Sequence, residues 1–206
     1  MKYCIPDCAL ASYTAQNILA GIVHEKETIE YIQKNAGDGI VVHAGAGFGD
    51  FLPHLQNLPN TIMAFEPHKE LYDACHKTIE NFNIENVVLS NKALSFTEGS
   101  IFLKEDGIRS ECSFWDGKMV EATTIDSIGK PISLIHLDVE GFEFSVLKGA
   151  DETIRKYSPT VILEIDARAV TYNEFMKTRY NYEPVAQLIH NAGPMVFVNT
   201  VYDYRP

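Results

Sequence analysis

The sequence predicts an α/β fold built around a mostly parallel sheet, and three observations support this. Short apolar runs of strand length alternate with amphipathic segments of helix length, a pattern typical of βαβ units. Several of these runs are continuously apolar, as expected for strands buried on both faces of a parallel sheet. No repeat or linker divides the 206 residues, so we expect a single domain, with an N-terminal helical segment over 1–37 followed by 38–206.

The first elements alternate between helix and strand. Residues 24–35 predict a helix closed by Gly37, and residues 39–44 form an apolar run that predicts a buried strand. Residues 50–57 predict the start of another helix, where Pro53 is acceptable only in the first turn.

The middle of the chain predicts one helix and three strands. Residues 61–66 are expected to form a strand, and residues 69–83 an amphipathic helix with its apolar residues near one face. Residues 86–94 and 99–106 predict two further strands, and the polar stretch 107–119 is expected to be irregular.

The last part of the chain completes the alternation. We expect an edge strand, a core strand, a helix, a strand, a final helix and a last strand or hairpin, at residues 120–128, 132–140, 143–158, 160–166, 183–191 and 195–204. Because parallel sheets bind ligands beyond the carboxyl ends of their strands, polar residues at those ends are the candidates for a site.

The composition limits the kinds of partner. The formal net charge is 17 − 28 = −11, which disfavours binding to nucleic acid or to anionic lipid. No apolar run is long enough for a membrane span, and the first residues lack the apolar core of a signal peptide. We therefore expect a cytoplasmic protein with a small-molecule or glycan partner, and the sequence does not predict its oligomeric state.

The cysteines predict neither disulfides nor a metal site. Their number is small for the length of the chain, so reduced thiols are expected at Cys4, Cys8, Cys75 and Cys112. Cys4, Cys8 and His24 have loose spacing for a zinc site and lack a fourth ligand.

A glycine-rich stretch follows the first core strand. Gly45, Gly47 and Gly49 stand at alternate positions, which indicates that the backbone passes close to something bulky. Glu66 ends the next strand, 21 residues after Gly45, where an acid commonly accepts hydrogen bonds from the ribose of a nucleoside. The alternative is structural: the glycines make only a tight turn, and Glu66 only ends its strand.

The spacing of the glycines separates two cofactor types. A dinucleotide site requires G-x-G-x-x-G, but the sixth position from Gly45 is Asp50, whose charge would oppose a pyrophosphate. The observed G-x-G-x-G is the pattern of class I methyltransferases, whose cofactor, S-adenosyl-L-methionine, is a sulfonium cation without phosphate. A nicotinamide-dependent oxidoreductase is therefore the weaker hypothesis.

A second group of polar residues follows the core strand at 132–140. Asp138, Glu140 and Glu143 crowd the strand end, and carboxylates this close raise one another's pKa, so one of them could act as a base near neutral pH. The alternative is that they serve only turn and capping chemistry, and Glu143 is the residue that this alternative fits best.

Several stretches together carry a family resemblance. They are "VVHAGAGFGDF", "AFEPHKELYD", "NVVLSNKALS", "EATTIDSI", "LIHLDVEGFEFSVLKGADETI" and "SPTVILEID". In this order they cover about residues 38–166, and the chain resembles the FkbM family of S-adenosylmethionine-dependent methyltransferases. The resemblance implies a Rossmann-like class I methyltransferase fold with a seven-strand sheet and helices on both faces. It also implies O-methylation, typically of sugar hydroxyls in glycans or of natural products.

The resemblance also implies roles for individual residues. Gly45 to Gly47 would line the methionine part of the cofactor, Glu66 would hold the ribose, and residues 91–93 would lie beside the adenine. The cofactor-binding residues implied in this way are His43, Ala44, Gly45, Ala46, Gly47, Glu66, Pro67, Asn91, Ala93 and Asp138. The chain departs from the family at His43, where an acid is usual, and at His136, where lysine is frequent.

The proposed chemistry is an in-line methyl transfer to a hydroxyl, which needs alignment and a base. Asp138 or Glu140 is the expected base, with His136 as a further candidate. We expect contacts with the acceptor from Glu164, Ser110 and Ser113.

Two alternatives to this mechanism stay open. The three carboxylates Asp138, Glu140 and Glu164 would also suit Mg²⁺ or Ca²⁺, although no metal is expected. The other alternative is an inactive protein of the same fold that binds the cofactor, its pocket altered by His43.

Overall fold

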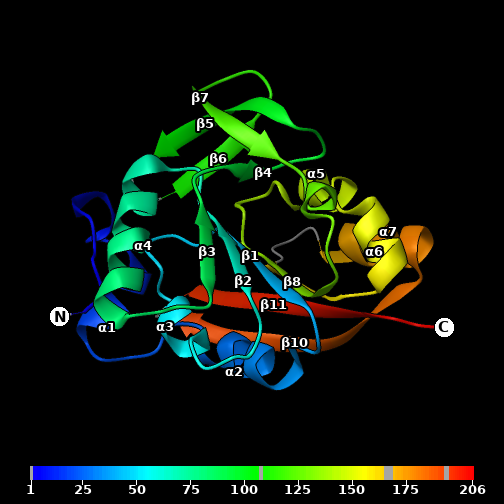
Figure 1. Cartoon of the computed structure of the whole chain (residues 1–206), viewed down its shortest axis with the longest axis horizontal. Coiled ribbons are helices and arrows are strands. Elements are labelled where there is room, and N and C mark those ends of the chain that lie inside the picture. The colour runs from blue at the N-terminus through cyan, green and yellow to red at the C-terminus, as the bar shows by residue number, and fades with distance from the viewer. Residues whose placement is uncertain (1, 107–108, 165–168, 193–194) are drawn as a thin grey trace.

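The main sheet of the computed structural model has seven strands and is mostly parallel (Figure 1). The structure describes residues 2–106, 109–164, 169–192 and 195–206. In the order β10-β11-β9-β8-β1-β2-β3, the strands span Tyr182–Ala192, Met195–Tyr204, Thr160–Glu164, Ile132–Leu137, Ile40–Ala44, Ile62–Phe65 and Val87–Ser90. The last five of these strands run parallel, whereas β11 is antiparallel to β9 and to β10.

Helices cover both faces of this sheet because the central strands are apolar on both sides. On β1, Val41 packs with α2 (Lys26–Asn35), α3 (Leu52–Leu55) and α4 (Lys69–Phe82). The next residue, Val42, points to the other face and packs with α5 (Glu143–Lys148), α6 (Asp151–Tyr157) and α7 (Ala169–Tyr180). Figure 1 shows the two groups of helices on opposite sides of β1 and β8.

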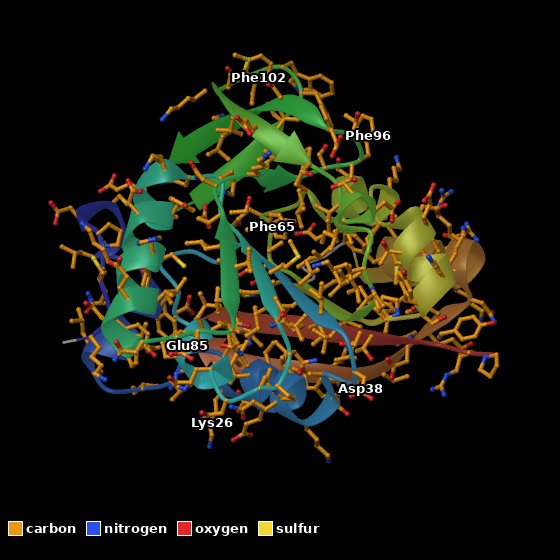
Figure 2. The ribbon with its side chains drawn as sticks, viewed as in Figure 1. Lys26, Asp38, Phe65, Glu85, Phe96 and Phe102 are labelled. Carbon is orange, nitrogen blue, oxygen red and sulfur yellow. The ribbon has the colours of Figure 1, made fainter. Side chains whose placement is uncertain are left out.

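A second sheet of four strands lies above the ends of the main sheet (Figure 1). In the order β4-β7-β5-β6, its strands span Ala93–Leu94, Lys118–Thr123, Gly99–Asp106 and Arg109–Ser113. Figure 2 shows Phe65 near the middle of the molecule, whereas Phe96 and Phe102 lie at the end that carries this second sheet.

The second sheet corrects three sequence predictions. The strand predicted over 86–94 is two strands in different sheets, and the segment 107–119 contains β6 within its described part. The predicted edge strand over 120–128 begins earlier and lies between β4 and β5, followed by a short 3-10 helix at Asp126–Ile128. The sequence shows the strand propensity of residues 86–94 and 120–128, but not that of β6 and not which sheet each strand joins.

The helix predicted over 143–158 is interrupted. It consists of α5 and α6, and the break is at Gly149, where the backbone approaches the main chain of Ser95. A β-carbon at Gly149 would lie 2.0 Å from the carbonyl oxygen of Ser95, so no other residue fits at this crossing without movement.

The final helix predicted over 183–191 is wrong, because these residues belong to β10. Val185, Leu188 and Ile189 have the i, i+3, i+4 spacing of a helix, but Val185 and Ile189 are exposed, so this stripe is not a buried face. Pro184 is compatible with β10 because the strand lies at the edge of the sheet. The helix in this region is α7, which the sequence analysis did not identify. Of the two predictions for residues 195–204, the last strand is confirmed as β11, which pairs antiparallel with β10.

The N-terminal segment contains a 3-10 turn at Asp7–Ala9, α1 (Tyr13–Leu19) and α2. The division at residue 37 stays a prediction. In the described part of the chain, no helix combines the length and the apolar character that crossing a membrane requires.

Candidate active site

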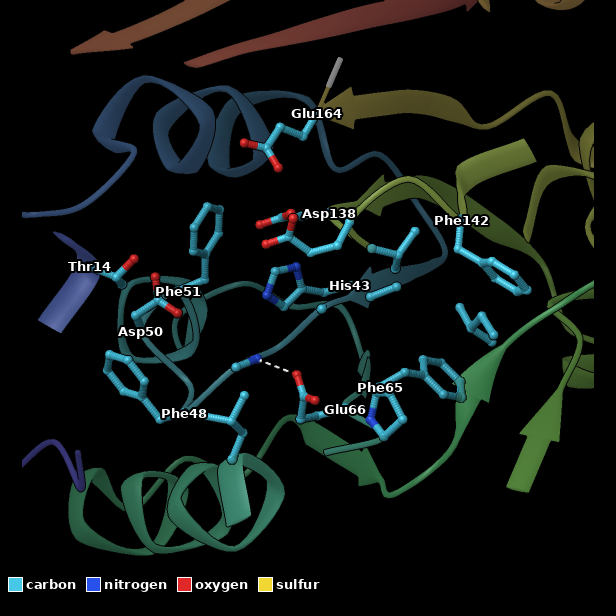
Figure 3. Close-up of a pocket in the computed structure, with 18 of the residues that line it drawn as sticks. Thr14, His43, Phe48, Asp50, Phe51, Phe65, Glu66, Asp138, Phe142 and Glu164 are labelled. Atoms are coloured by element: carbon cyan, nitrogen blue, oxygen red, sulfur yellow. Dashed lines mark hydrogen bonds between the residues drawn. The ribbon is translucent and has the colours of Figure 1, made fainter. Parts of the chain in front are cut away.

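A cavity of about 320 Å³ lies beyond the carboxyl ends of the parallel strands (Figure 3). Its wall includes Ala44 and Gly45 from the end of β1, Glu66 and Pro67 after β2, and Asp138 after β8. The topology of a parallel sheet predicts a ligand site at this place. The cavity therefore brings together most of the residues that the sequence identified as candidates.

Two glycines of the loop after β1 have different roles. Gly45 has a φ of +82°, and a β-carbon there would lie 1.7 Å from the carbonyl oxygen of Asp138, so glycine is needed where the two strand-end loops cross. Gly47 has a φ of +53°, and a β-carbon there would meet only the Asp50 side chain, at 3.8 Å. Gly47 is the glycine that leaves space beside the cavity, whereas Ala46 packs in the core beneath it.

Glu66 is a buried carboxylate held by two backbone amides. Its Oε2 accepts a hydrogen bond from the amide of Gly47 at 2.8 Å, drawn as the dashed line in Figure 3, and its Oε1 accepts from the amide of His68 at 2.8 Å. Burial raises the pKa of Glu66 to about 7, although these two bonds favour the ionised form. Each oxygen keeps a lone pair for a further donor.

The residues expected beside the adenine divide into two groups. Asn91 donates through Nδ2 to the carbonyl oxygens of Glu66 and Pro67, at 2.8 and 3.2 Å, so its side chain holds the backbone. Lys92 and Ala93 line the cavity itself. The role of Asn91 is thus to support Glu66.

Asp138 and Glu164 form a carboxyl pair at the ends of neighbouring strands. Figure 3 shows their side chains pointing toward one another in the cavity. Burial, the charge of Glu164 and a hydrogen bond with Glu164 raise the pKa of Asp138 well above its usual range. Glu140 lines the same cavity from an exposed, left-handed position with a φ of 50°. Two of the three predicted carboxylates therefore border the cavity together with Glu164.

Glu143 serves the structure, as the capping interpretation predicts. It is 1% exposed, and its Oε1 accepts from the amide of Gly141 at 3.0 Å while its Oε2 accepts from the hydroxyl of Tyr172 at 2.7 Å. These bonds tie the turn after β8 to α7.

We predict that Tyr172→Phe lowers the free energy of unfolding by about 1–3 kcal/mol, because Glu143 loses a buried donor. Urea denaturation followed by circular dichroism measures this. The control is Tyr204→Phe, at a tyrosine that is 45% exposed. Equal stability of the two variants would show that the Tyr172–Glu143 bond contributes little.

His43 and His136 are neighbours on β1 and β8, and their Nδ1 atoms lie 2.8 Å apart. Burial lowers the pKa of His43 to about 3 and that of His136 to about 4, so both are neutral at pH 7. His43 lines the cavity, whereas His136 lies behind it and is 1% exposed. The structure does not bring His136 to the cavity, so a role as base is no longer supported for it.

The predicted contacts from the second sheet differ from those found. Ser110 lies in β6, but its side chain is outside the described part of the structure. The hydroxyl of Ser113 donates to the carbonyl of Asp116 at 2.6 Å and closes a turn. Among the described side chains of β6, Cys112 lines the cavity, and Trp115 is 83% exposed.

Sequence reasoning missed the contribution of the N-terminal segment. Ser12, Thr14 and Glu25 line the cavity, and Glu25 is 6% exposed. Glu25 accepts a hydrogen bond from Nδ2 of Asn199 at 2.7 Å, and its Oε1 lies 3.2 Å from Nε2 of His190. A glutamate at the start of a helix looks like an ordinary cap, and nothing in the local sequence shows that distant strands bury it.

Asp50 lines the cavity as well, and burial together with the charge of Glu25 raises its pKa to about 7. Within the described residues, no three histidine, cysteine or acidic side chains are grouped so as to hold a metal ion.

The family model described as methyltransferase FkbM domain matches residues 43–193, which is well over half of the chain. The chain belongs to the FkbM methyltransferase family. The family identified from the sequence stretches above is therefore confirmed.

Solved structures with the same fold include a methyltransferase FkbM from Methylobacillus flagellatus KT. The TM-score is 0.65 at 15% identity, and the match covers 98% of this FkbM chain but only 56% of that protein. A precorrin-6y C5,15-methyltransferase from Geobacter metallireducens GS-15 matches with a TM-score of 0.56 at 14% identity, covering 87% and 89% of the two chains.

A tRNA (uracil-54, C5)-methyltransferase from Pyrococcus abyssi, solved in complex with S-adenosyl-L-homocysteine, has a TM-score of 0.52 at 9% identity, with 86% and 38% covered. These likenesses confirm the predicted class I methyltransferase fold. Comparison with curated proteins gave no match.

Proposed function

We propose that this FkbM chain is an O-methyltransferase that uses S-adenosyl-L-methionine and methylates a hydroxyl of a sugar, a glycan or a natural product. The observation that carries the proposal is the cavity where the open backbone at Gly47 meets the buried carboxylate of Glu66. Family membership supports methyl transfer. The hydroxyl acceptor rests on the family resemblance and on the carboxylates beside the cavity.

The wall of the cavity fits a nucleoside that carries positive charge. Six carboxylate residues line it, namely Glu25, Asp50, Glu66, Asp138, Glu140 and Glu164. The ammonium group of Lys92, also on the wall, is 3.1 Å from the carboxylate of Glu121. Glu25, whose pKa is lowered despite its burial by the hydrogen bond and the charge of His190, keeps such a wall negative, so that it attracts a sulfonium and an ammonium group and repels a pyrophosphate. We therefore favour S-adenosyl-L-methionine over a nicotinamide dinucleotide.

The residues present suggest how the cofactor would be held. Glu66 would accept hydrogen bonds from the ribose hydroxyls through its remaining lone pairs. Gly45 and Gly47 would border the methionine part with backbone only, and Phe65 and Ala93 would provide an apolar wall for the adenine.

When bound, S-adenosyl-L-methionine supplies a methyl group on a positively charged sulfur atom. The protein has to align the acceptor oxygen and remove its proton, because an alcohol is a weak nucleophile. Asp138 is our candidate base, since a raised pKa makes its carboxylate more basic once it is ionised. Glu164 would orient the acceptor, and Glu140, at the exposed side of the cavity, is the second candidate base.

The test has a binding step and a turnover step. Calorimetry should show binding of S-adenosyl-L-methionine and S-adenosyl-L-homocysteine, and mass spectrometry should show one added methyl group on an acceptor from a panel of sugars, glycans and macrolides. If the protein binds neither ligand, the assignment of S-adenosyl-L-methionine as its cofactor is refuted. Binding without any methylated product would favour the alternative, an inactive cofactor-binding protein.

Adding a chelator to the turnover assay tests whether a metal ion assists the reaction. We expect the chelator to leave the rate unchanged, and a loss of activity would favour the metal-assisted alternative. The net charge of −11 supports a small-molecule or glycan acceptor over nucleic acid, and a cytoplasmic location stays our expectation.

Cofactor affinity should fall with decreasing pH. Glu66 has a raised pKa of about 7, so acid neutralises the carboxylate that would accept the ribose hydroxyls. From pH 8 to pH 6 we expect Kd for S-adenosyl-L-homocysteine to rise about tenfold from this group alone. Protonation of Asp50, whose pKa is also raised to about 7, would weaken binding over the same pH range. The Asp50→Asn variant removes this contribution and leaves that of Glu66. Equal affinity at both pH values would contradict the role of Glu66.

A further inference from the structure

The two buried histidines beside the cavity form a hydrogen-bonded pair. The ring planes of His43 and His136 are within 7° of parallel, with centroids 5.0 Å apart and Nδ1 atoms at 2.8 Å. These values fit two imidazoles that share an in-plane hydrogen bond. Phe51 stacks on both rings at centroid distances of 5.0 and 5.3 Å, so the pair is fixed in orientation.

The two neutral rings must be in different tautomers. Each neutral imidazole has one N–H, and a single proton can lie between the two Nδ1 atoms. The ring that donates through Nδ1 has an Nε2 without a proton, which is an acceptor. The other ring carries its proton on Nε2. Both rings are neutral because burial holds the pKa of His43 near 3 and that of His136 near 4.

The outer nitrogen of His43 is where a ligand would be expected. Among the described residues, the buried Nε2 atoms of His43 and His136 have no hydrogen-bond partner. A buried polar atom without a partner costs about 1–3 kcal/mol, so a partner supplied by a ligand would favour binding. Of the two rings, His43 is the one on the cavity wall, and it is 2% exposed.

The surroundings indicate the charge of that ligand group. Figure 3 shows the ring of His43 beside Phe51 and below the carboxyl group of Asp138, with Asp50 on the same side as Phe51. Glu25 acts electrostatically on His43, Asp50 and Asp138 from the cavity wall. Burial alone would raise the pKa of Glu25, but the hydrogen bond and the charge of His190 lower it, so Glu25 is a lasting negative charge here. This end of the cavity favours a cation.

We propose that Nε2 of His43 accepts a hydrogen bond from the α-ammonium group of the methyl donor, in the field of Glu25. His136 is then a positioning residue, because its Nδ1 accepts the proton of His43 Nδ1 and keeps His43 Nε2 free of a proton. A neutral histidine can contact an ammonium group beside a sulfonium, whereas a charged one would repel both. This inference rests on the proposed function and assigns the amino-acid end of the same site.

Calorimetry with two ligands tests the assignment. S-adenosyl-L-homocysteine has the amino-acid end, and 5′-methylthioadenosine has the same nucleoside and sulfur without it. For His43→Phe, which keeps a ring next to Phe51, we expect Kd for S-adenosyl-L-homocysteine to rise about 10- to 100-fold, as for the loss of a hydrogen bond to a charged group. Kd for 5′-methylthioadenosine should stay within about twofold. His76→Phe, at an exposed site on α4, is the matched control and should change neither.

Three results would overturn the inference. Equal losses for both ligands would mean that His43 only shapes the pocket, and no loss for either would mean that it makes no contact. If the wild-type protein binds neither ligand, the proposed function itself fails, and this inference fails with it. If the wild-type protein binds both, the proposed function stands, and within the calorimetry the variant comparison tests the inference.

Nitrogen NMR of the histidine-labelled wild-type protein gives a readout that does not depend on a variant. We expect the Nε2 resonance of His43 to shift on addition of S-adenosyl-L-homocysteine and not of 5′-methylthioadenosine. In His136→Phe, His43 Nδ1 loses its acceptor, and the resonances should show a mixture of both tautomers. A His43 Nε2 that carries a proton in the wild-type complex would contradict the assignment.

Discussion

Replacing Asp138 with asparagine should lower kcat by about 10²- to 10⁴-fold, the range over which a positioned general base contributes. Asparagine keeps the size of the side chain and cannot take up the proton of a hydroxyl. Because Asp138 lies beside the like charge of Glu164, removing its charge is not expected to destabilise the fold. Because Asp138 is also one of the cofactor-binding residues that the resemblance implies, Kd for S-adenosyl-L-homocysteine is measured alongside, and a fall in kcat well beyond any rise in Kd separates catalysis from binding.

Glu140→Gln is the matched control, because Glu140 belongs to the same turn but is exposed. We expect a smaller loss of kcat in this variant, measured with the same acceptor. A greater loss at Glu140 than at Asp138 would transfer the role of base to Glu140. Unchanged kcat in both variants would mean that no carboxylate of this turn accepts the proton.

The second large effect is expected at Glu66. In Glu66→Gln, Kd for S-adenosyl-L-homocysteine should rise by about 10²-fold or more, because hydrogen bonds to a charged group contribute about 1.5–3 kcal/mol each. In the wild-type protein the backbone N–H groups of Gly47 and His68 each donate to one oxygen of Glu66. The NH₂ group of the glutamine side chain would face one of these two N–H groups, so that two donors would meet. The loop and the ribose site would thus be affected together.

Comparing S-adenosyl-L-homocysteine with 5′-methylthioadenosine, as for His43, distinguishes a loss at the ribose from a loss at the amino-acid end. Glu66→Gln should weaken both S-adenosyl-L-homocysteine and 5′-methylthioadenosine, because both contain the ribose. The control is Glu85→Gln, at an exposed position shown in Figure 2. Wild-type affinity of Glu66→Gln for both ligands, by calorimetry, would exclude Glu66 as the ribose-binding residue.

The sequence could predict the main sheet because its central strands are buried on both faces. Val41 and Val42 pack into different clusters on opposite sides of β1, and this gives the continuous apolar run that the sequence shows. The strand β10 could not be predicted, because its Val185, Leu188 and Ile189 also fit a helix. Pairing with β11 decides its structure, and a propensity pattern does not contain that pairing.

The same limit applies to the site. Gly47, Glu66 and Asp138 could be predicted because each lies within three residues of the carboxyl end of a strand, and the carboxyl ends of parallel strands meet at one edge. Glu25 could not be predicted, since its burial depends on Asn199, which is 174 positions away. The pairing of His43 with His136 likewise follows from the register of β1 and β8.

The central claim is that the glycine loop and Glu66 hold an adenosyl cofactor in the cavity at the strand ends. A crystal structure of the chain with S-adenosyl-L-homocysteine tests it most directly. We predict the ribose hydroxyls within hydrogen-bond distance of Glu66 and the backbone of Gly47 beside the ligand. A ligand bound elsewhere, or a cavity filled by side chains with Glu66 bonded only to Gly47 and His68, would contradict it.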